Sequence, residues 1–247
     1  MSLLLVKNLA LSVKDQPILK NVSLNINSGE IQALVGPNGS GKSSLVAALM
    51  GQPAYQVTKG DIIFNRKKLL KLRPDQRSKN GLFVAWQSPV IIPGLKVEEF
   101  LLKLFKLHGR EREKDWPLLK IRQDVARQAR KLKSVGLLTR DLNDGLSGGE
   151  KKCLEALQMT IIRPRLAVLD EIDSGLDIGS LLAVGKMIRE LNRQGTAFLI
   201  ISHQGRLLQE VKAQKINVLV KGKIVASDGP RLLKTLNRSG FKTWLKD

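Results

Sequence analysis

The chain contains a glycine-rich segment with the spacing of a phosphate-binding loop. Residues 36–43 read Gly-Pro-Asn-Gly-Ser-Gly-Lys-Ser, which matches the pattern G-x-x-x-x-G-K-[ST]. Glycines allow backbone N–H groups to surround phosphates, the lysine neutralises the β- and γ-phosphates, and the serine hydroxyl binds Mg²⁺. We therefore expect Ser43 to be a magnesium ligand in a nucleoside triphosphate site. The residues expected to bind the nucleotide are Gly36, Pro37, Asn38, Gly39, Ser40, Gly41, Lys42, Ser43 and Ser44.

Two adjacent carboxylates follow an apolar segment further along the chain. Residues 166–169 are Leu-Ala-Val-Leu, and Asp170 and Glu171 come next. Such a segment predicts a buried strand, whose carboxyl end lies at the ligand-binding edge of an α/β sheet. We expect Asp170 to hold Mg²⁺, directly or through water, and Glu171 to be the general base for the attacking water. Adjacent acids also occur at helix N-termini, so this assignment depends on the upstream loop.

A second candidate phosphate site lies at residues 146–150, Leu-Ser-Gly-Gly-Glu. A Ser-Gly-Gly turn that opens a helix offers a hydroxyl and backbone N–H groups to a phosphate, here from Ser147, Gly148 and Gly149. One nucleotide would then have two phosphate sites. The simplest arrangement is two chains that close head to tail over two nucleotides, with Asp177 at the position where the facing subunit touches.

Two further polar residues follow predicted strands. Gln87 comes after residues 82–86 and is expected to reach Mg²⁺ and the attacking water. His203 comes after residues 197–201 and is expected to donate to the γ-phosphate. A single glutamine or histidine in such a place is more often structural. The order of Gln87 and His203 relative to the phosphate loop and the carboxylates supports both assignments.

The elements that must position these residues are those of an α/β domain. Short apolar segments predict a covered, largely parallel sheet, and an alternating N-terminal pattern predicts an antiparallel β edge. Helical spacing between the core strands predicts an inserted helical subdomain at approximately residues 90–160. Predicted strands cover residues 3–11, 22–26, 30–35, 60–64, 82–86, 166–169, 197–201 and 218–220, and helical segments cover 43–50, 97–138, 181–191 and 230–247.

Length and composition indicate one globular domain spanning residues 1–247. The chain is 43% hydrophobic, which is enough for a full core. Residues 1–7 lack the features of a signal peptide, and no apolar run approaches a membrane span, so we expect a cytoplasmic protein. The single cysteine, Cys153, excludes an internal disulfide and a multi-cysteine metal site. We interpret it as a packing residue in preference to a redox group.

The formal net charge is +20. The lysines and arginines are scattered along the sequence, and only 4% of residues are aromatic, with no alternation of basic and aromatic residues. This pattern favours a solvated surface or an acidic protein partner over nucleic acid.

Taken in order, the phosphate loop, Gln87, the Leu-Ser-Gly-Gly-Glu turn, Asp170 with Glu171, Asp177 and His203 resemble ABC-type ATPases across nearly the whole chain. More narrowly, residues 87–94, 149–152 and 171–178 resemble the SufC family. The resemblance implies the ABC ATPase cassette fold, ATP and Mg²⁺ as cofactors, and ATP hydrolysis. Residues 13–16 lack an aromatic residue to stack on adenine, so the preference for ATP over GTP also depends on the resemblance.

The SufC resemblance implies the ATPase subunit of a SUF iron–sulfur cluster assembly complex. Its partners would be SufB- and SufD-like scaffold proteins, which supply the cluster ligands, with a transient homodimer on ATP binding and no direct membrane contact. Two alternatives stay open, namely the nucleotide-binding subunit of an ABC transporter and an ABC protein that acts on nucleic acid or the ribosome. The single cassette argues against ribosome-acting relatives, and the lack of a coiled-coil insertion argues against a DNA-repair type.

Two departures from the ABC pattern are Ser44, where threonine is usual, and Cys153, where arginine is usual. Lys152 precedes this cysteine in the helix expected after the Ser-Gly-Gly turn. We hypothesise that Lys152 pairs with Glu171 in a resting monomer and keeps ATPase activity low.

Overall fold

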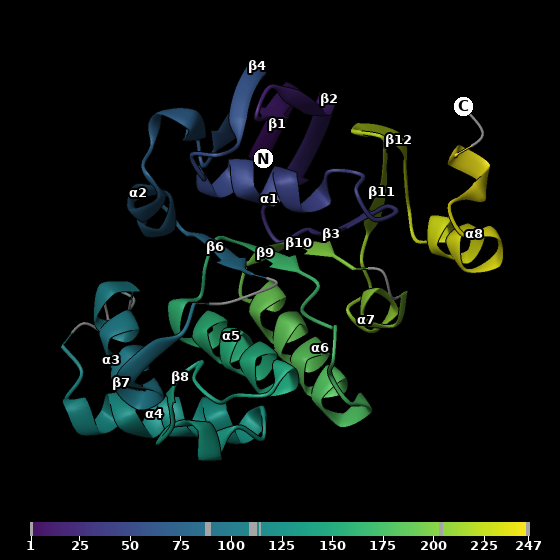
Figure 1. The fold of residues 1–247 in the computed structure, drawn as a ribbon. Helices are drawn as coiled ribbons and strands as arrows, with labels where there is room; N and C mark the ends of the chain where they lie inside the picture. The colour runs from purple at the N-terminus through teal and green to yellow at the C-terminus, as the bar shows by residue number, and fades with distance from the viewer. Residues whose placement is uncertain (1, 87–89, 109–112, 114, 203–204, 246–247) are drawn as a thin grey trace.

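The computed structural model describes residues 2–86, 90–108, 113, 115–202 and 205–245 (Figure 1). A six-stranded sheet crosses the middle of the molecule, with helices α5 (Gly148–Ile162) and α6 (Ile178–Arg193) on one face. On the other face, helix α1 (Lys42–Met50) lies between this sheet and a four-stranded antiparallel sheet. Two apolar clusters, one on each face of the central sheet, form the core.

The central sheet has the strand order β12-β11-β3-β10-β9-β6, and all its pairs are parallel except β11 with β12. Every residue of β3, β9 and β10 is buried, because helices or the second sheet cover both faces. The parallel strands all end at one edge. The strands are β3 (Ile31–Val35), β6 (Leu82–Ala85), β9 (Leu166–Asp170), β10 (Ala197–Ile201), β11 (Lys215–Val220) and β12 (Lys223–Asp228).

The predicted antiparallel edge is confirmed as a sheet of order β2-β1-β4-β5. Its hairpin turns at Lys14 and Asp15, both with positive φ (46° and 62°), as a tight two-residue turn requires. The buried residues of β2 alternate with exposed ones, so one face of the sheet packs toward α1. The strands are β1 (Ser2–Val13), β2 (Gln16–Asn27), β4 (Gln56–Phe64) and β5 (Lys67–Lys68).

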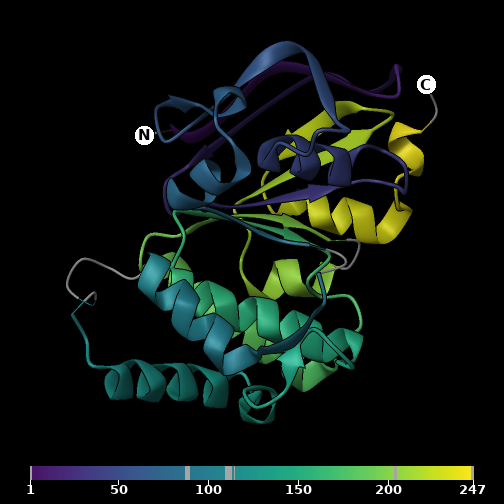
Figure 2. The same cartoon turned by 60° about the vertical axis from the view of Figure 1, so that its left-hand side comes forward.

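The expected helical region contains α3 (Val97–His108) and α4 (Leu118–Lys131), which pack with α5 on the lower side of the molecule (Figure 2). The prediction omitted a short pair of strands, β7 (Ile92–Lys96) and β8 (Asp141–Leu142), which closes this region.

Shorter elements complete the fold. They are α2 (Pro74–Lys79), α7 (Gly205–Glu210), α8 (Arg231–Ser239) and the 3₁₀ turns Leu69–Lys71, Val135–Leu137 and Lys242–Trp244. The C-terminal segment is helical as predicted, and its Leu233, Phe241 and Trp244 pack on the core. Within the described residues, no helix is both long and apolar enough to cross a bilayer.

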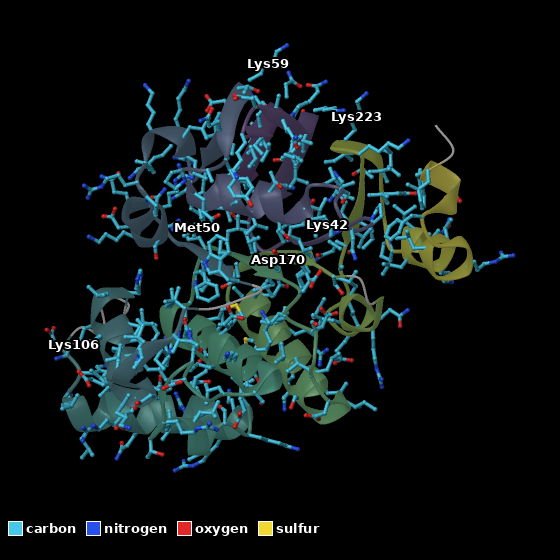
Figure 3. The ribbon with its side chains drawn as sticks, viewed as in Figure 1. Lys42, Met50, Lys59, Lys106, Asp170 and Lys223 are labelled. Atoms are coloured by element: carbon cyan, nitrogen blue, oxygen red, sulfur yellow. The ribbon has the colours of Figure 1, made fainter. Side chains whose placement is uncertain are left out.

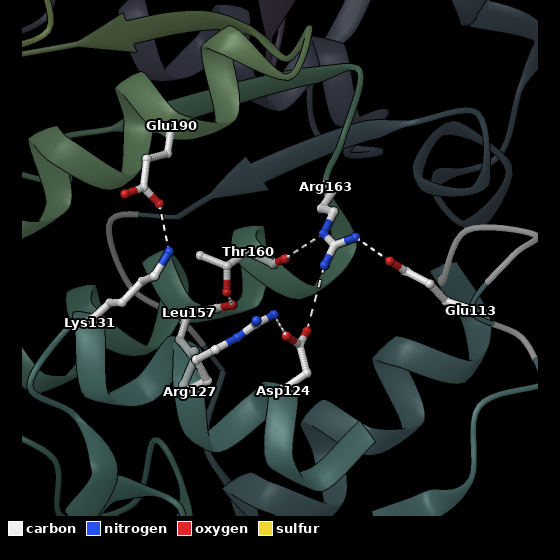
Figure 4. A network of polar contacts seen from close by, with 8 residues as sticks. All are labelled: Glu113, Asp124, Arg127, Lys131, Leu157, Thr160, Arg163 and Glu190. Atoms are coloured by element: carbon white, nitrogen blue, oxygen red, sulfur yellow. Dashed lines mark hydrogen bonds and ion pairs between the residues drawn. The ribbon is translucent and has the colours of Figure 1, made fainter. Parts of the chain in front are cut away.

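A polar network joins α4 to the junction between α5 and β9 (Figure 4). Arg163, which ends α5 with a φ of 49°, pairs through its guanidinium with Glu113 Oε1 at 2.5 Å and Asp124 Oδ2 at 3.6 Å. Asp124 also pairs with Arg127. The carboxylate of Asp124 is almost fully buried, so its two arginine partners compensate a charge that water does not reach.

We predict that Arg163→Met destabilises the protein by about 3 kcal/mol, because the buried carboxylates of Glu113 and Asp124 each lose a guanidinium partner. Urea denaturation of both proteins measures the change in the free energy of unfolding. The control, Arg193→Met, removes the same charge from an exposed residue near the end of α6 and is expected to cost under about 0.5 kcal/mol. Equal effects of the two substitutions would contradict a structural role for the network.

Candidate functional site

The phosphate loop connects β3 to α1, as its motif requires. Gly39 and Gly41 have φ values of 75° and 104°, a region that residues with a Cβ rarely adopt. A Cβ on Gly36 would lie 2.1 Å from the carbonyl oxygen of Leu219. The glycines are therefore needed for the loop's shape and for its close packing on β11.

The Lys42 side chain is folded over this loop. Its Nζ donates to the carbonyl oxygens of Gly36 at 2.9 Å and Pro37 at 3.0 Å. Burial lowers the pKa of Lys42, while the charges of Glu171 and Asp170 raise it. The ammonium is thus positioned at the loop, near Glu171, the predicted general base, and Asp170, the predicted magnesium ligand, and it can neutralise phosphate charge there.

Asp170 ends β9 and is 3% exposed. Burial raises the pKa of Asp170, a hydrogen bond from the Ser43 hydroxyl lowers it, and the charge of Glu171 raises it. Its Oδ1 is buried without a hydrogen-bond partner in the described part of the chain. An unsatisfied carboxylate oxygen beside a serine hydroxyl is the type of oxygen ligand that Mg²⁺ prefers, so these residues fit the expected cation.

Glu171 follows β9 with a φ of 53°, an uncommon conformation for a residue other than glycine. Its backbone N–H donates to the carbonyl oxygen of Ile201, at the end of the adjacent strand β10, at 2.9 Å. Residues held in such backbone conformations cluster at active sites. Together with Lys42 and Ser43, Glu171 lines a cleft of about 600 Å³.

A second cleft, of about 650 Å³, contains the Ser-Gly-Gly turn. Ser147 begins α5 and forms a capping box with Glu150: Ser147 Oγ accepts from the Glu150 N–H at 3.3 Å, and Glu150 Oε2 accepts from the Ser147 N–H at 2.8 Å. Arg140 pairs with Glu150 at 2.8 Å. Gly148 and Gly149 form the first turn of α5, whose N–H groups have no partner within the helix.

Asp177 and Cys153 line the same second cleft. Asp177 caps α6, since its Oδ1 accepts from the Ser180 N–H at 2.9 Å and its Oδ2 from the Ser180 hydroxyl at 2.6 Å. These bonds lower the pKa of Asp177. Burial raises the pKa of the Cys153 thiol, which keeps it protonated at neutral pH and agrees with a packing residue.

The structure thus separates the predicted site residues into two groups. Asn38, Gly39, Gly41, Lys42, Ser43, Ser44 and Glu171 line the first cleft, with Asp170 close enough to Ser43 for its hydroxyl to lower the pKa of Asp170, whereas Ser147, Gly148, Gly149 and Asp177 line the second. Gln87 and His203 lie outside the described residues. Ile18 of β2 also lines the first cleft, and the sequence analysis missed it because an isolated apolar residue in a strand carries no signal of its own.

The hypothesis that Lys152 pairs with Glu171 is wrong for this structure. Lys152 Nζ lies 3.1 Å from Glu155 Oε2 and 2.6 Å from the carbonyl oxygen of Trp86. Glu155 is three residues along the same helix and equally buried, so it meets the lysine without any movement of the chain.

We predict that Asp170→Asn raises the melting temperature of the protein without ligand at pH 7. The raised pKa of Asp170 means that its charged form costs stability, so the stability of the unsubstituted protein falls as pH rises past the ordinary carboxyl pKa. The difference between the two proteins should shrink below that pKa. Differential scanning calorimetry between pH 3 and 8 tests this, and a lower melting temperature for Asp170→Asn at pH 7 would contradict it.

The same substitution should weaken nucleoside triphosphate binding in the presence of Mg²⁺ by about 10-fold or more, because it removes a negatively charged oxygen ligand. Binding without Mg²⁺ is the internal control and should change little, which isothermal titration calorimetry can measure in both conditions.

Comparisons with known proteins agree with this geometry. Residues 19–174 match the family model described as ABC transporter. "Probable ATP-dependent transporter ycf16" of Cyanophora paradoxa is 42% identical over 246 residues, which are 98% of this chain and 94% of that relative. A nucleotide-free ATP-binding cassette from an ABC transporter superposes over 100% of both chains, with a TM-score of 0.80 and 24% identity.

A dimeric ATP-binding cassette in a post-hydrolysis state, bound to ADP and phosphate, has the same fold. Its TM-score is 0.78 at 20% identity, over 92% of this chain and 98% of that one. The family match and the Cyanophora paradoxa relative establish the family as well as the fold, because each covers more than half of the sequence. The chain therefore belongs to the ABC transporter family of ATP-binding cassettes, and it is an ATPase that binds ATP with Mg²⁺ and hydrolyses ATP.

Proposed function

We propose that this chain is the SufC-like ATPase subunit of a cytoplasmic SufBCD-like iron–sulfur cluster assembly complex. In this proposal ATP-driven dimerisation changes the conformation of scaffold partners. The sequence support is the resemblance of residues 87–94, 149–152 and 171–178 to that family. Only one cysteine is present in the chain, which is consistent with cluster ligands that belong to the partners.

The structural observation that carries the proposal is an exposed apolar segment. Val90, Ile91 and Ile92 are 75%, 48% and 41% exposed. Asn143 fixes this segment, because its Nδ2 donates to the carbonyl oxygen of Val90 at 2.6 Å. Adjacent exposed apolar side chains in a fixed conformation are typical of a surface that another protein covers.

This segment also has a defined connection to the helical region. The Lys96 ammonium pairs with Asp141 Oδ1 at 2.6 Å, and the Gly94 N–H donates to Asp141 Oδ2 at 3.2 Å, so β8 holds β7 in place. The proposed helical subdomain, approximately residues 90–160 of the single domain 1–247, would therefore move together with a partner bound at residues 90–92.

In the proposed catalytic site, residues 36–44 hold the phosphates of ATP, and Ser43, Asp170 and Gln87 hold Mg²⁺, which would neutralise charge on the β- and γ-phosphates when bound. Glu171 positions the attacking water and accepts its proton. His203 donates a hydrogen bond to the γ-phosphate.

Two clefts in one chain support a head-to-tail dimer. The clefts of about 600 and 650 Å³ share no lining residue, so the Ser147–Gly149 turn and the phosphate loop of one chain do not form a single pocket. In the proposed dimer, Ser147, Gly148, Gly149 and Asp177 of one copy complete the nucleotide site of the other. The dimeric post-hydrolysis cassette of the same fold is consistent with this arrangement.

The second candidate is the nucleotide-binding subunit of an ABC transporter. The name of the Cyanophora paradoxa relative, an ATP-dependent transporter, favours it. Both candidates use the same catalytic site and differ in the protein that binds the exposed segment. Co-purification from native cells separates them, because SufB- and SufD-like scaffolds support the first and membrane permeases support the second. Co-purified nucleic acid would contradict both.

We predict that Lys42→Ala and Ser147→Arg chains, each inactive alone, regain ATPase activity when mixed. Each lesion lies in a different cleft, so a mixed dimer keeps one intact composite site. With random pairing, the mixture should reach about a quarter of the activity of the unsubstituted protein. Steady-state phosphate release measures it.

The matched control is a mixture of Lys42→Ala with Glu171→Gln. These two residues line the same cleft, so a mixed dimer has no intact site and should stay inactive. Recovery in the control, or no recovery in the first mixture, would contradict the head-to-tail dimer.

We predict that Ile91→Asp abolishes co-purification of the scaffold partners. A buried charge at a central interface position costs about 2 kcal/mol or more, which is roughly a 30-fold loss of affinity. The control is Val225→Asp on β12, where the replaced side chain is 43% exposed and distant in sequence from the segment. Retention of the scaffolds by Ile91→Asp, measured by quantitative pull-down, would remove the structural basis of the proposal.

A further inference from the structure

Two side chains of helix α5 form hydrogen bonds with the backbone of Trp86, the residue that follows β6. Lys152 Nζ donates to the carbonyl oxygen of Trp86 at 2.6 Å, and Glu155 Oε1 accepts from the N–H of Trp86 at 2.7 Å. Lys152 and Glu155 also pair with each other at 3.1 Å. One ion pair thus satisfies both backbone groups of Trp86, and we call these three residues the α5 clamp.

The two charged residues of the α5 clamp are buried. Lys152 is 5% exposed and Glu155 is 3% exposed. Burial raises the pKa of Glu155, and the charge of Lys152 lowers it. Apolar residues of similar volume often stabilise a core as well as or better than a buried ion pair. Packing alone therefore does not explain this ion pair. Its hydrogen bonds to the backbone of Trp86 do, because the carbonyl oxygen needs a donor and the N–H needs an acceptor.

The clamp lies beside the proposed magnesium ligand. β6 pairs with β9 in parallel, with Ala85, the last residue of β6, opposite Leu169. Trp86, which follows β6, is therefore next to Asp170, the last residue of β9. Electrostatics agree with this placement, because the charge of Lys152 is among the influences that lower the otherwise raised pKa of Asp170. The clamp therefore fixes the end of β6 at the carboxyl edge of the sheet, next to the catalytic carboxylates.

The clamp also belongs to the helix that begins in the second cleft. Ser147 caps α5, and Lys152 and Glu155 lie about 8 and 12 Å further along the same helix. A continuous helix of this length moves as a rigid element. A displacement of the Ser147 turn is therefore transmitted to Trp86, and a displacement of Trp86 is transmitted to the turn.

We propose that Lys152 and Glu155 are positioning residues that couple the two clefts of the ATPase. They hold the end of β6 in register with Asp170 and join it to the helix that presents the Ser147 turn. Closure of a second copy on one cleft then arranges the catalytic edge of the other. The inference rests on the ATPase assignment and the two clefts, and it holds whichever partner binds residues 90–92.

The test uses Lys152→Met and Glu155→Gln in the full-length protein. Glu155→Gln keeps an acceptor for the Trp86 N–H and removes the ion pair, whereas Lys152→Met removes the donor to the Trp86 carbonyl. We expect kcat for ATP hydrolysis to fall at least about 10-fold in each, with KM for ATP changed less than about 2-fold. We also expect amide hydrogen exchange at Trp86 to become at least about 10-fold faster.

A second readout does not involve turnover. ATP binding without Mg²⁺ should be unchanged in both variants, because the phosphate loop is intact, whereas the gain in affinity on adding Mg²⁺ should be smaller. The matched controls are Lys103→Met and Glu99→Gln, which break an exposed pair on α3 at 2.8 Å and should leave kcat unchanged.

If a single substitution prevents folding, the double variant Lys152→Met/Glu155→Gln is used in the same assays in place of the single variant. The double variant leaves no unpaired buried charge. The proposal is overturned by folded variants, single or double, whose kcat and Mg²⁺ dependence equal those of the unsubstituted protein. Lower thermal stability with unchanged kinetics also overturns the proposal, because that result shows that the pair of Lys152 and Glu155 is purely structural.

Discussion

The buried carboxylate of Asp170 needs hydrogen bonds and positive charges from its neighbours. A carboxylate that is 3% exposed loses most of its hydration, which is costly unless hydrogen bonds and positive charges replace water. The Ser43 hydroxyl and the charges of Lys152 and Lys42 act in this direction, yet the pKa of Asp170 stays raised. Its Oδ1 has no partner in the described residues. The site is therefore arranged for a cation, and the binding of Mg²⁺ with ATP would relieve a cost that folding leaves in place.

The central sheet was predictable because its strands are buried on both faces and hence continuously apolar. Ala197–Ile201 was predicted without error, and β9 differs from its prediction by one residue. The β7 and β8 pair was not predicted, since Pro93 and Gly94 disfavour a strand and the partner has only two residues. Such a pair forms because tertiary contacts, including the ion pair between Lys96 and Asp141, outweigh local preference.

The candidate site was predictable to the extent that function fixes residue types and order. The phosphate loop and the two carboxylates at the end of β9, Asp170 and Glu171, meet at one edge because parallel strands end there. The partner of Lys152 was not predictable in this way. A lysine on a helix can reach several acids. Only the packed structure shows that Lys152 contacts Glu155 and the carbonyl oxygen of Trp86. Ile18 enters the cleft for a similar reason, through the packing of β2 on the loop.

The positive charge of the surface follows partly from which residues the fold buries. Among the described residues, the buried acids are Glu113, Asp124, Glu155, Asp170 and Asp173, and the buried bases are Lys42, Arg77 and Lys152. More acids than bases are thus withdrawn from the surface, and the remaining lysines, such as Lys59, Lys106 and Lys223 in Figure 3, extend outward. The exposed residues therefore carry a larger net positive charge than the whole chain, whose formal charge is +20. This positive charge attracts ATP and other anions, and at about 0.1 M salt the attraction is largely screened beyond about 10 Å. The charge thus favours encounter, while in the proposed mechanism the buried contacts at Asp170 and in the α5 clamp act after binding.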